Sequence, residues 1–456
     1  MYDVAIIGGG PGGYAAALYA HNFGLSVALV EKDEVGGTCL LRGCIPAKTW
    51  LQTADVYSIV SRSADYGVVS SPPEMDWSAA LARKQQVVSG LVKGLSGLLK
   101  ARGVEIIDGY GRLIHGGVEV AAADGTTQQI EARNVIVATG SVPRSIPGYD
   151  IDGTRIVTSD HALDWPRQPR RVAIIGGGVI GCEFASLLSE LGTKVHLFEA
   201  LDSLLPGTEP EAVKVLTRDF KKHKVKMHTA TMVGPAQIGD EGVVVPYGDD
   251  SVEVEVVLVA VGRAPVTSDI GLEEAGVTLD GGFVVVDSET MLTSAPGVYA
   301  VGDIVAGAPQ LAHAGFAEGI AAITHIATGG VAPVDYRAIP LVAYTHPEIA
   351  SVGLTEAAAR DAGIDFEVSS HGMRGVGRAI IQGQTGGVVK IIAEKDGPII
   401  GATVAGPGAG EMIHELMYAV AWEALPAEAA ALIHAHPTVS EAIGETLLAA
   451  SGKTLH

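Results

Sequence analysis

The chain has 456 residues, of which 52 are Asp or Glu and 31 are Lys or Arg, so its formal net charge is −21. Such a charge is repelled by phosphate backbones and argues against a nucleic-acid partner. No apolar run reaches the roughly 18 residues of a membrane span, and the N-terminus lacks the basic segment of a signal peptide. We therefore expect no membrane partner and a soluble, cytoplasmic protein of several domains.

The N-terminal stretch predicts a dinucleotide-binding unit. Residues 3–7 form an apolar strand, and residues 14–23 form a helix. Residues 25–30 form a second strand, which ends at Glu31. Between the first strand and the helix stand the glycines of a G-x-G-x-x-G pattern, Gly8, Gly10 and Gly13. Such glycines permit a tight turn and the approach of a pyrophosphate to the helix N-terminus, while the acid binds ribose hydroxyls.

The next stretch contains two of the three cysteines, Cys39 and Cys44, with four residues between them. A helix is expected over residues 47–59, with Pro46 in its first turn. A thiol near a helix N-terminus is favoured as thiolate, and a bend at Gly43 would let the two sulfurs meet. The arrangement favours reversible thiol–disulfide exchange over the alternative of two buried, inert cysteines.

The dinucleotide unit recurs later in the chain. Residues 171–175 and 193–198 are the expected strands, and residues 182–191 are the helix. The glycines Gly176, Gly178 and Gly181 and the acid Glu199 each lie 168 residues after their counterparts in the first unit. Two complete units in register predict two Rossmann-like dinucleotide sites.

The surroundings of the two units distinguish their ligands. Glu199 would repel a 2′-phosphate, and no arginine follows it to accept one, which favours NAD at the second site. The first site lies next to the cysteine pair, where a redox ring must take electrons from a dithiol. A flavin can do this and pass a hydride to nicotinamide, so the first site is expected to bind FAD.

Three further segments complete the expected fold. Strands at 135–140 and 256–261 each end in a small-residue turn. A third strand ends at Asp303, which could bind a ribityl hydroxyl or cap a helix. From about residue 336, strands followed by helices at 410–422 and 427–433 indicate an α+β domain. The predicted class is α/β, with two Rossmann-like domains and a C-terminal α+β domain.

A histidine pair lies near the C-terminus. His436 precedes a proline and should be extended, and Glu441 falls early in the next helix. A carboxylate that holds one imidazole nitrogen raises the basicity of the other, which suits proton exchange with a thiol. His434 is expected to be a neighbour or a packed residue. No further ligands at a useful spacing support a metal site, so none is predicted.

The cysteine motif GGTCLLRGCIPAK, both glycine units, and the segments VATG, YAVGD, LAH, YTHPEIASVG and HAHPTVSE resemble the flavin-dependent pyridine nucleotide–disulfide oxidoreductases over essentially the whole chain. The resemblance implies that Cys39 is the interchange thiol and Cys44 is the thiolate beside the flavin. It implies that Lys48 lies near the flavin and pairs with Glu183. It also implies that His436, oriented by Glu441, is the acid/base.

The resemblance extends to cofactor contacts and partners. Implied FAD contacts, besides the first glycine loop, are Glu31, Thr38, Lys48, Gly111, Thr139, Gly140, Asp303 and Ala312. Implied NAD contacts, besides the second loop, are Glu183, Glu199 and Gly262. The expected domains are an FAD domain at 1–147, an NAD domain at 148–264, a continuation of the FAD domain at 265–335, and a dimerisation domain at 336–456. The histidine would reach the cysteines of a second copy, so a homodimer is implied.

The implied reaction is the oxidation of dihydrolipoamide by NAD⁺ through a Cys39–Cys44 disulfide and FAD. The partner would be a lipoyl-bearing protein of a 2-oxo acid dehydrogenase or glycine cleavage complex. One alternative is the reduction of another small disulfide, such as that of glutathione or mycothione, and Arg42 departs from the family's usual motif. A second alternative is a component that acts mainly in the assembly of a multienzyme complex.

Overall fold

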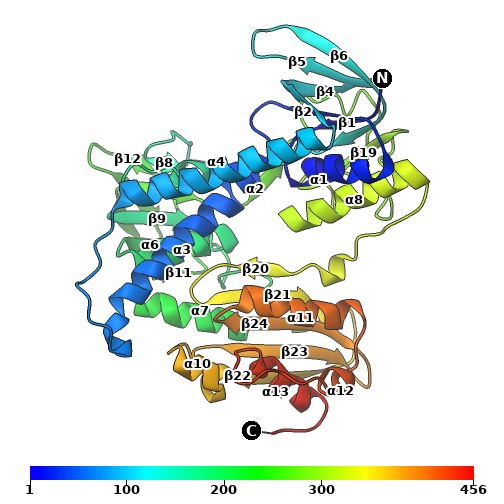
Figure 1. The fold of residues 1–456 in the computed structure, drawn as a ribbon. Coiled ribbons are helices and arrows are strands. Elements are labelled where there is room, and N and C mark those ends of the chain that lie inside the picture. The colour runs from blue at the N-terminus through cyan, green and yellow to red at the C-terminus, as the bar shows by residue number, and fades with distance from the viewer. Residues whose placement is uncertain (456) are drawn as a thin grey trace. The chain divides into compact units, whose positions relative to one another are not determined.

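The structure, a computed structural model, describes residues 1–455 and forms two compact units (Figure 1). Unit 1 comprises residues 1–50, 78–144 and 263–336. Unit 2 comprises residues 51–77, 145–262 and those from 337 onward. Among residues 1–455, no helix combines the length and the apolar character needed to cross a bilayer.

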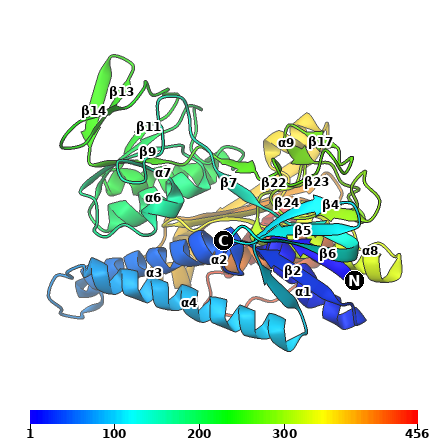
Figure 2. The same cartoon turned by 90° about the horizontal axis from the view of Figure 1, so that it is seen from above.

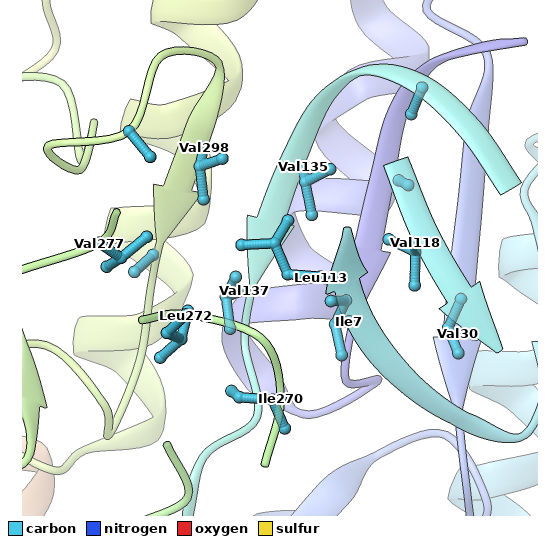
Figure 3. Packing of buried hydrophobic residues seen from close by; sticks show 14 of the residues in the cluster. Ile7, Val30, Leu113, Val118, Val135, Val137, Ile270, Leu272, Val277 and Val298 are labelled. Atoms are coloured by element: carbon cyan, nitrogen blue, oxygen red, sulfur yellow. The ribbon is translucent and has the colours of Figure 1, made fainter. Parts of the chain in front are cut away.

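Unit 1 is built on a seven-stranded sheet with the order β3-β2-β1-β6-β5-β4, in which β19 also pairs with β6. The parallel strands are β1 (Tyr2–Ile7), β2 (Val27–Glu31), β3 (Glu105–Asp108), β6 (Thr127–Val137) and β19 (Val298–Ala300). The strands β4 (Tyr110–Ile114) and β5 (Gly117–Ala121) extend β6 as an antiparallel meander. Figure 3 shows one face of this sheet, where Ile7, Val30, Leu113, Val135 and Val298 contribute to a buried apolar cluster.

The other face of the sheet is covered by helices. Helix α1 (Pro11–Ala20) lies against α8 (Ala312–Thr328), and Figure 1 shows the two side by side. Glycines make this close contact possible, since a Cβ on Gly319 would lie 2.6 Å from the carbonyl oxygen of Gly12. The remaining helices with residues in unit 1 are α2 (Gly37–Arg42), α3 (Cys44–Ser61), which continues into unit 2, and α4 (Trp77–Ala101).

The nucleotide-binding half of unit 2 repeats the parallel arrangement. Its sheet has the order β11-β10-β9-β15-β8, from β8 (Ile156–Val157), β9 (Arg171–Ile175), β10 (Lys194–Phe198), β11 (Lys226–His228) and β15 (Val256–Val259). Helices α5 (Ser159–Ala162), α6 (Val179–Glu190) and α7 (Pro210–Lys222) accompany it. The strands β12 (Gln237–Ile238), β13 (Val243–Tyr247) and β14 (Asp250–Val254) form a small antiparallel sheet, whose β13–β14 hairpin projects in Figure 2.

The C-terminal half of unit 2 is an antiparallel sheet with helices. The strand order is β20-β21-β24-β23-β22, from β20 (Leu341–Ala343), β21 (Glu348–Gly353), β22 (Phe366–Gly372), β23 (Val388–Glu394) and β24 (Ile399–Gly406). Helix α11 (Ala409–Ala421) packs on β21 and β24, and α13 (Glu441–Ala450) packs on β22 and β23. Shorter helices are α9 (Glu356–Asp361), α10 (Gly377–Ile381) and α12 (Pro426–Ala429).

The predicted fold class is confirmed, with some element boundaries corrected. The helix expected from residue 47 begins at Cys44, and the one expected over 14–23 is α1, which begins at Pro11. The helix expected over 427–433 ends at Ala429. The chain turns at residues 430–432 and is irregular over 433–435, before the His436–Pro437 segment, where the proline restricts the residue that precedes it.

Candidate functional site

The two glycine loops have nearly the same geometry. Gly8 has a φ of +104° and Gly176 a φ of +109°, values that strongly favour glycine. A Cβ on Gly8 would lie 2.3 Å from the carbonyl oxygen of Ala138, and one on Gly176 would lie 2.3 Å from that of Ala260. The last glycines of the pattern, Gly13 and Gly181, also leave no room for a side chain, because each would clash with its loop's first carbonyl. The protein itself therefore requires the first and third glycines of each loop.

The middle glycines have a different role. A Cβ on Gly10 would touch nothing closer than the Cα of Gly37, at 3.8 Å, and one on Gly178 would touch nothing within 4 Å. Each is the N-cap residue of the helix that follows, α1 or α6. Free space at a helix N-terminus, where backbone N–H groups are unpaired, fits the approach of a pyrophosphate. Both loops therefore fit the dinucleotides predicted for them.

The two acids are bonded to their loops. Glu31 accepts the N–H of Gly9 at 2.6 Å, and the corresponding oxygen of Glu199 accepts the N–H of Gly177 at 2.7 Å. The second carboxylate oxygen of Glu199 accepts the N–H of Leu201 at 2.8 Å. These contacts hold each carboxylate beside its glycine loop. A carboxylate oxygen has two lone pairs, so capacity for a ribose hydroxyl remains.

The cysteine stretch is joined to the first glycine loop. The N–H of Gly36 donates to the carbonyl of Gly9 at 2.8 Å. A Cβ on Gly37 would lie 2.5 Å from the Cα of Gly10, so α2 can begin against the loop only because Gly37 has no side chain. Cys39 follows within α2, and Cys44 is the first residue of α3, as expected for a thiol at a helix N-terminus. The redox pair thus lies directly beside the first dinucleotide loop.

The two thiols are close together and hydrogen-bonded to each other. The hydrogen bond between the side chains of Cys39 and Cys44, together with burial, raises the pKa of the Cys39 thiol. The charge of Lys48, one turn into α3, acts in the opposite direction on the pKa of Cys39. Cys39 therefore holds its proton more strongly than an ordinary cysteine does.

Glu183 is buried on α6, where one of its carboxylate oxygens accepts the backbone N–H of Tyr344 at 3.0 Å. It belongs to unit 2, whereas Lys48 belongs to unit 1. The pairing of these two side chains therefore stays a prediction.

Asp303 belongs to a network that the sequence did not reveal. Its carboxylate accepts the hydroxyl of Ser141 at 2.5 Å, and that hydroxyl also accepts the Nε–H of Arg263 at 2.7 Å. Arg263 further donates to the carbonyl of Ser141 at 2.7 Å and, at 3.4 Å, to the hydroxyl of Thr38 beside Cys39. Ser141 and Arg263 follow Gly140 and Gly262, so a polar residue directly after each glycine turn was the available signal.

The other predicted FAD contacts lie in the same unit. Thr139 donates its hydroxyl to the carbonyl of Val266 at 2.6 Å, and Gly140 has open space around its Cα. Ala312 is the first residue of α8. Gly111 has a packing role, since a Cβ there would lie 2.9 Å from the side chain of Ile7. Contact of these residues with FAD stays a prediction. The same applies to Gly262 and NAD, although a Cβ on Gly262 would meet nothing within 4 Å.

The C-terminal histidines form two His–Glu pairs in unit 2. The Nδ1 of His436 lies 2.8 Å from a carboxylate oxygen of Glu441, whose other oxygen accepts the N–H of Thr438 at 2.9 Å. Those bonds lower the pKa of Glu441, so the carboxylate stays ionised and holds one ring nitrogen. The His436 side chain is 78% exposed. His434 is packed and pairs with Glu415 at 2.7 Å.

Comparisons with known proteins agree with this geometry. Residues 2–319 match the model of the pyridine nucleotide-disulphide oxidoreductase family, and residues 339–447 match the model of that family's dimerisation domain. A dihydrolipoyl dehydrogenase of Bacillus subtilis is 37% identical over all of this chain and 99% of its own. A mitochondrial dihydrolipoyl dehydrogenase of Arabidopsis thaliana is 39% identical, over all of this chain and 91% of its own.

A solved structure, LpdA from Mycobacterium tuberculosis, matches with a TM-score of 0.91 at 30% identity and covers 97% of this chain and 98% of its own. The similarity thus extends over both glycine loops, the cysteine pair and the C-terminal sheet. The chain belongs to the pyridine nucleotide-disulphide oxidoreductase family.

Proposed function

We propose that the protein is an FAD-dependent dihydrolipoamide dehydrogenase that uses NAD⁺ as hydride acceptor. The observation that carries the proposal is the attachment of the cysteine stretch to the first glycine loop, by the 2.8 Å hydrogen bond from Gly36 to Gly9. This bond brings a redox dithiol to one of two dinucleotide loops, and the second loop remains for a nicotinamide cofactor. Relatives named dihydrolipoyl dehydrogenase, similar over the whole chain, support the choice of substrate.

The residues of this chain would act in two exchange steps. A substrate thiol that has lost its proton to His436 attacks the Sγ of Cys39 in the oxidised enzyme, and the Cys39–Cys44 bond breaks with Cys44 leaving as thiolate. The second substrate thiol then attacks the mixed disulfide, which releases lipoamide and leaves Cys39 as a thiol. Cys39 and Cys44 would return to the disulfide by giving up an electron pair, for which FAD, when bound, would supply the acceptor and the route to NAD⁺. Glu441 keeps the imidazole of His436 oriented throughout.

We also propose that the active form is a homodimer joined by the C-terminal domain. His436 is exposed in one copy, and a group of apolar side chains on and near α11 and α12 is exposed with it, namely Tyr418, Trp422, Leu425, Leu432 and Ile433. Trp422 is 76% and Ile433 is 99% exposed. An apolar surface of this kind marks a protein interface. A second copy seated there would cover it and receive His436.

The finer assignments follow from the same proposal. The chain would divide into an FAD domain at 1–147, an NAD domain at 148–264, a continuation of the FAD domain at 265–335 and a dimerisation domain from 336. The protein would act in the cytoplasm on a lipoyl-bearing protein of a 2-oxo acid dehydrogenase or glycine cleavage complex. Arg42, which pairs with Asp33 near the cysteines, is the first residue to change if the substrate is another disulfide.

The test is the reduction of NAD⁺ by the purified holoenzyme with free dihydrolipoamide, followed together with the flavin spectrum. We expect NADH formation and a transient long-wavelength band from the Cys44 thiolate beside the flavin. The His436→Gln variant should retain its flavin and lose most of the exchange rate, while His434→Gln serves as the matched control. A flavin-loaded protein that oxidises NADH with another disulfide but does not turn over dihydrolipoamide would contradict the proposal.

A further inference from the structure

A cavity of about 260 Å³ lies within unit 2, and its lining includes none of the glycine-loop, cysteine or His436 residues. It is formed where three helices end and a loop passes. Its charged and titratable lining residues come from the end of α3, from α6, from α7 with its C-cap, and from the loop after β20: Arg62, Glu190, Asp219, Lys222, His223 and His346.

Two polar atoms at this cavity have no partner. The side chain of Glu190 is 3% exposed, and its Oε1 is buried without a hydrogen bond. The titratable group closest to that oxygen by a recorded contact is the imidazole of His346, whose Nδ1 is 3.9 Å away, beyond hydrogen-bonding distance. The Nε of Arg62 is likewise buried without a partner. A buried polar atom without a partner is unfavourable, so an occupant of the cavity that hydrogen-bonds to both atoms would be stabilised there.

The charges around the cavity show what kind of group would satisfy both atoms. Asp219 is already bound to His223, at 2.9 Å. Arg62 and Lys222 make no ion pair with any residue among 1–455. Burial, and secondarily the charge of Asp55, raises the pKa of Glu190 to about 7, so near neutral pH much of this carboxyl is protonated and can donate a hydrogen bond. Arg62 and Lys222 therefore offer two cationic donors at the cavity, and the protonated carboxyl of Glu190 offers an O–H donor.

We propose that this cavity binds a small oxyanion, the phosphate or carboxylate group of a metabolite, through Arg62, Lys222 and the carboxyl of Glu190. An oxyanion accepts hydrogen bonds from all three groups and neutralises the two cations. Metal binding offers no alternative, because no group of three or more potential ligands within residues 1–455 is arranged to hold an ion. The site does not depend on the identity of the dithiol substrate.

The position of the cavity suggests an effector site. Helix α3 begins at Cys44 and ends at Ser61, next to Arg62, while α6 begins directly after Gly178 and ends at Glu190. An occupant would thus bind at the far ends of the two helices whose first turns carry the redox thiol and the second glycine loop.

The experiment is calorimetric titration of the full-length holoenzyme with sulfate and, separately, with succinate, at matched ionic strength in chloride. Sulfate represents the phosphate class and succinate the carboxylate class, and saturable binding of either one supports the site. Lys222→Met should weaken that binding at least about tenfold, and the matched control Lys221→Met, from the same exposed helix turn, should not. Binding of neither anion, or equal binding by both variants, would overturn the proposal.

The pH dependence gives a second, independent criterion. Sulfate stays fully ionised between pH 6 and pH 8, so changes in its affinity report on the protein. Ionisation of Glu190 puts a carboxylate against the anion, and the wild-type affinity should fall about tenfold over this range. Glu190→Gln keeps a donor at every pH, so its affinity should fall much less than that of the wild type. The part that remains would come from deprotonation of His223, whose pKa is raised by its hydrogen bond to Asp219. The same fall in affinity in Glu190→Gln would show that Glu190 is not part of the site.

Discussion

The two glycine loops share their backbone geometry and differ in what lies against them. In the first, Gly36 donates to the carbonyl of Gly9 at 2.8 Å, and in the second Leu205 donates to the carbonyl of Gly177 at the same distance. The next residue in the chain, Gly37, has no side chain and so lets α2 lie against the loop. The second loop has no such helix, and the space beside Gly178 is open.

The difference separates a resident cofactor from an exchangeable one. A dinucleotide at the first loop would lie beside the start of α2, the helix that carries Cys39, and contact with this segment would help to retain it. A dinucleotide at the second loop would make no such contact. In the proposed function, the same motif would serve a flavin that stays at the first loop and a nicotinamide that leaves the second loop after each turnover. The segment from Gly36 to Arg42 would make the difference.

The largest expected effect distinguishes Cys44, beside the first glycine loop, from Cys182, beside the second. Cys44→Ser should lower turnover on dihydrolipoamide by about 10³-fold or more, because the dithiol cannot form. Cys182→Ser is the matched control. Cys182 is fully buried on α6 and donates to the carbonyl of Gly177 at 3.2 Å, a bond that a serine hydroxyl can keep. Steady-state rates for both variants check this, and a comparable loss in Cys182→Ser would refute the division of roles.

An effect of intermediate size should distinguish the first glycine loop, which α2 contacts, from the second, where the space beside Gly178 is open. Gly37→Ala places a methyl group 2.5 Å from the Cα of Gly10, at a φ of +59°, so α2 must move off the loop and the flavin content after gel filtration should drop severalfold. Gly178→Ala meets nothing within 4 Å and should keep its flavin. Its KM for NAD⁺ should rise about tenfold, or 1.4 kcal/mol, because the methyl group occupies the phosphate approach. The reverse pattern would break the comparison.

The smallest expected effect is a pH dependence of stability that arises from two histidines of unit 2. His196 and His228 stack on Phe198 at the end of the second parallel sheet, and burial lowers the pKa of both imidazoles from the ordinary value of 6.5. The folded protein therefore holds these protons less strongly than the unfolded chain, and stability should fall as the pH drops below 6.5. We expect His228→Phe, which preserves the stacking, to reduce the loss in Tm between pH 7 and pH 5.5 by about 2 °C.

His115→Phe, in the exposed turn between β4 and β5 of the first unit, is the control for that measurement. It should leave the dependence of Tm on pH as it is in the wild type. A wild-type Tm that does not change between pH 7 and pH 5.5 would contradict the predicted effect of His196 and His228.

The sequence was informative where local chemistry determines structure. The offset of 168 residues between the glycine patterns predicted two parallel βαβ units, and β1–β2 and β9–β10 pair as expected. The tight turns at Gly8 and Gly176 could be predicted from the glycine pattern, because both positions have a positive φ and a close carbonyl that only glycine accommodates. A helix start near Cys44 followed from Pro46, which favours a first turn, although the helix begins at Cys44 itself and not at the expected residue 47.

What escaped prediction depends on contacts between distant segments. The bond between Ser141 and Asp303 joins residues separated by 162 positions, and no local pattern indicates it. Helix α4 was not predicted, since its residues include Gly90, Gly94 and Gly97, which weaken a helical pattern. The cavity at Glu190 arises only when the ends of α3, α6 and α7 come together.

The contact of Gly37 with Gly10 also has a consequence for biogenesis. If α2 closes over the first loop only after the chain has folded around it, the flavin must be captured before that closure, during synthesis or early folding. The cellular supply of flavin would then limit the yield of active protein during its synthesis, and not after folding is complete. A chain that matured without it would refill slowly, at the rate at which α2 opens, while the supply of NAD⁺ would act on the finished protein at every moment.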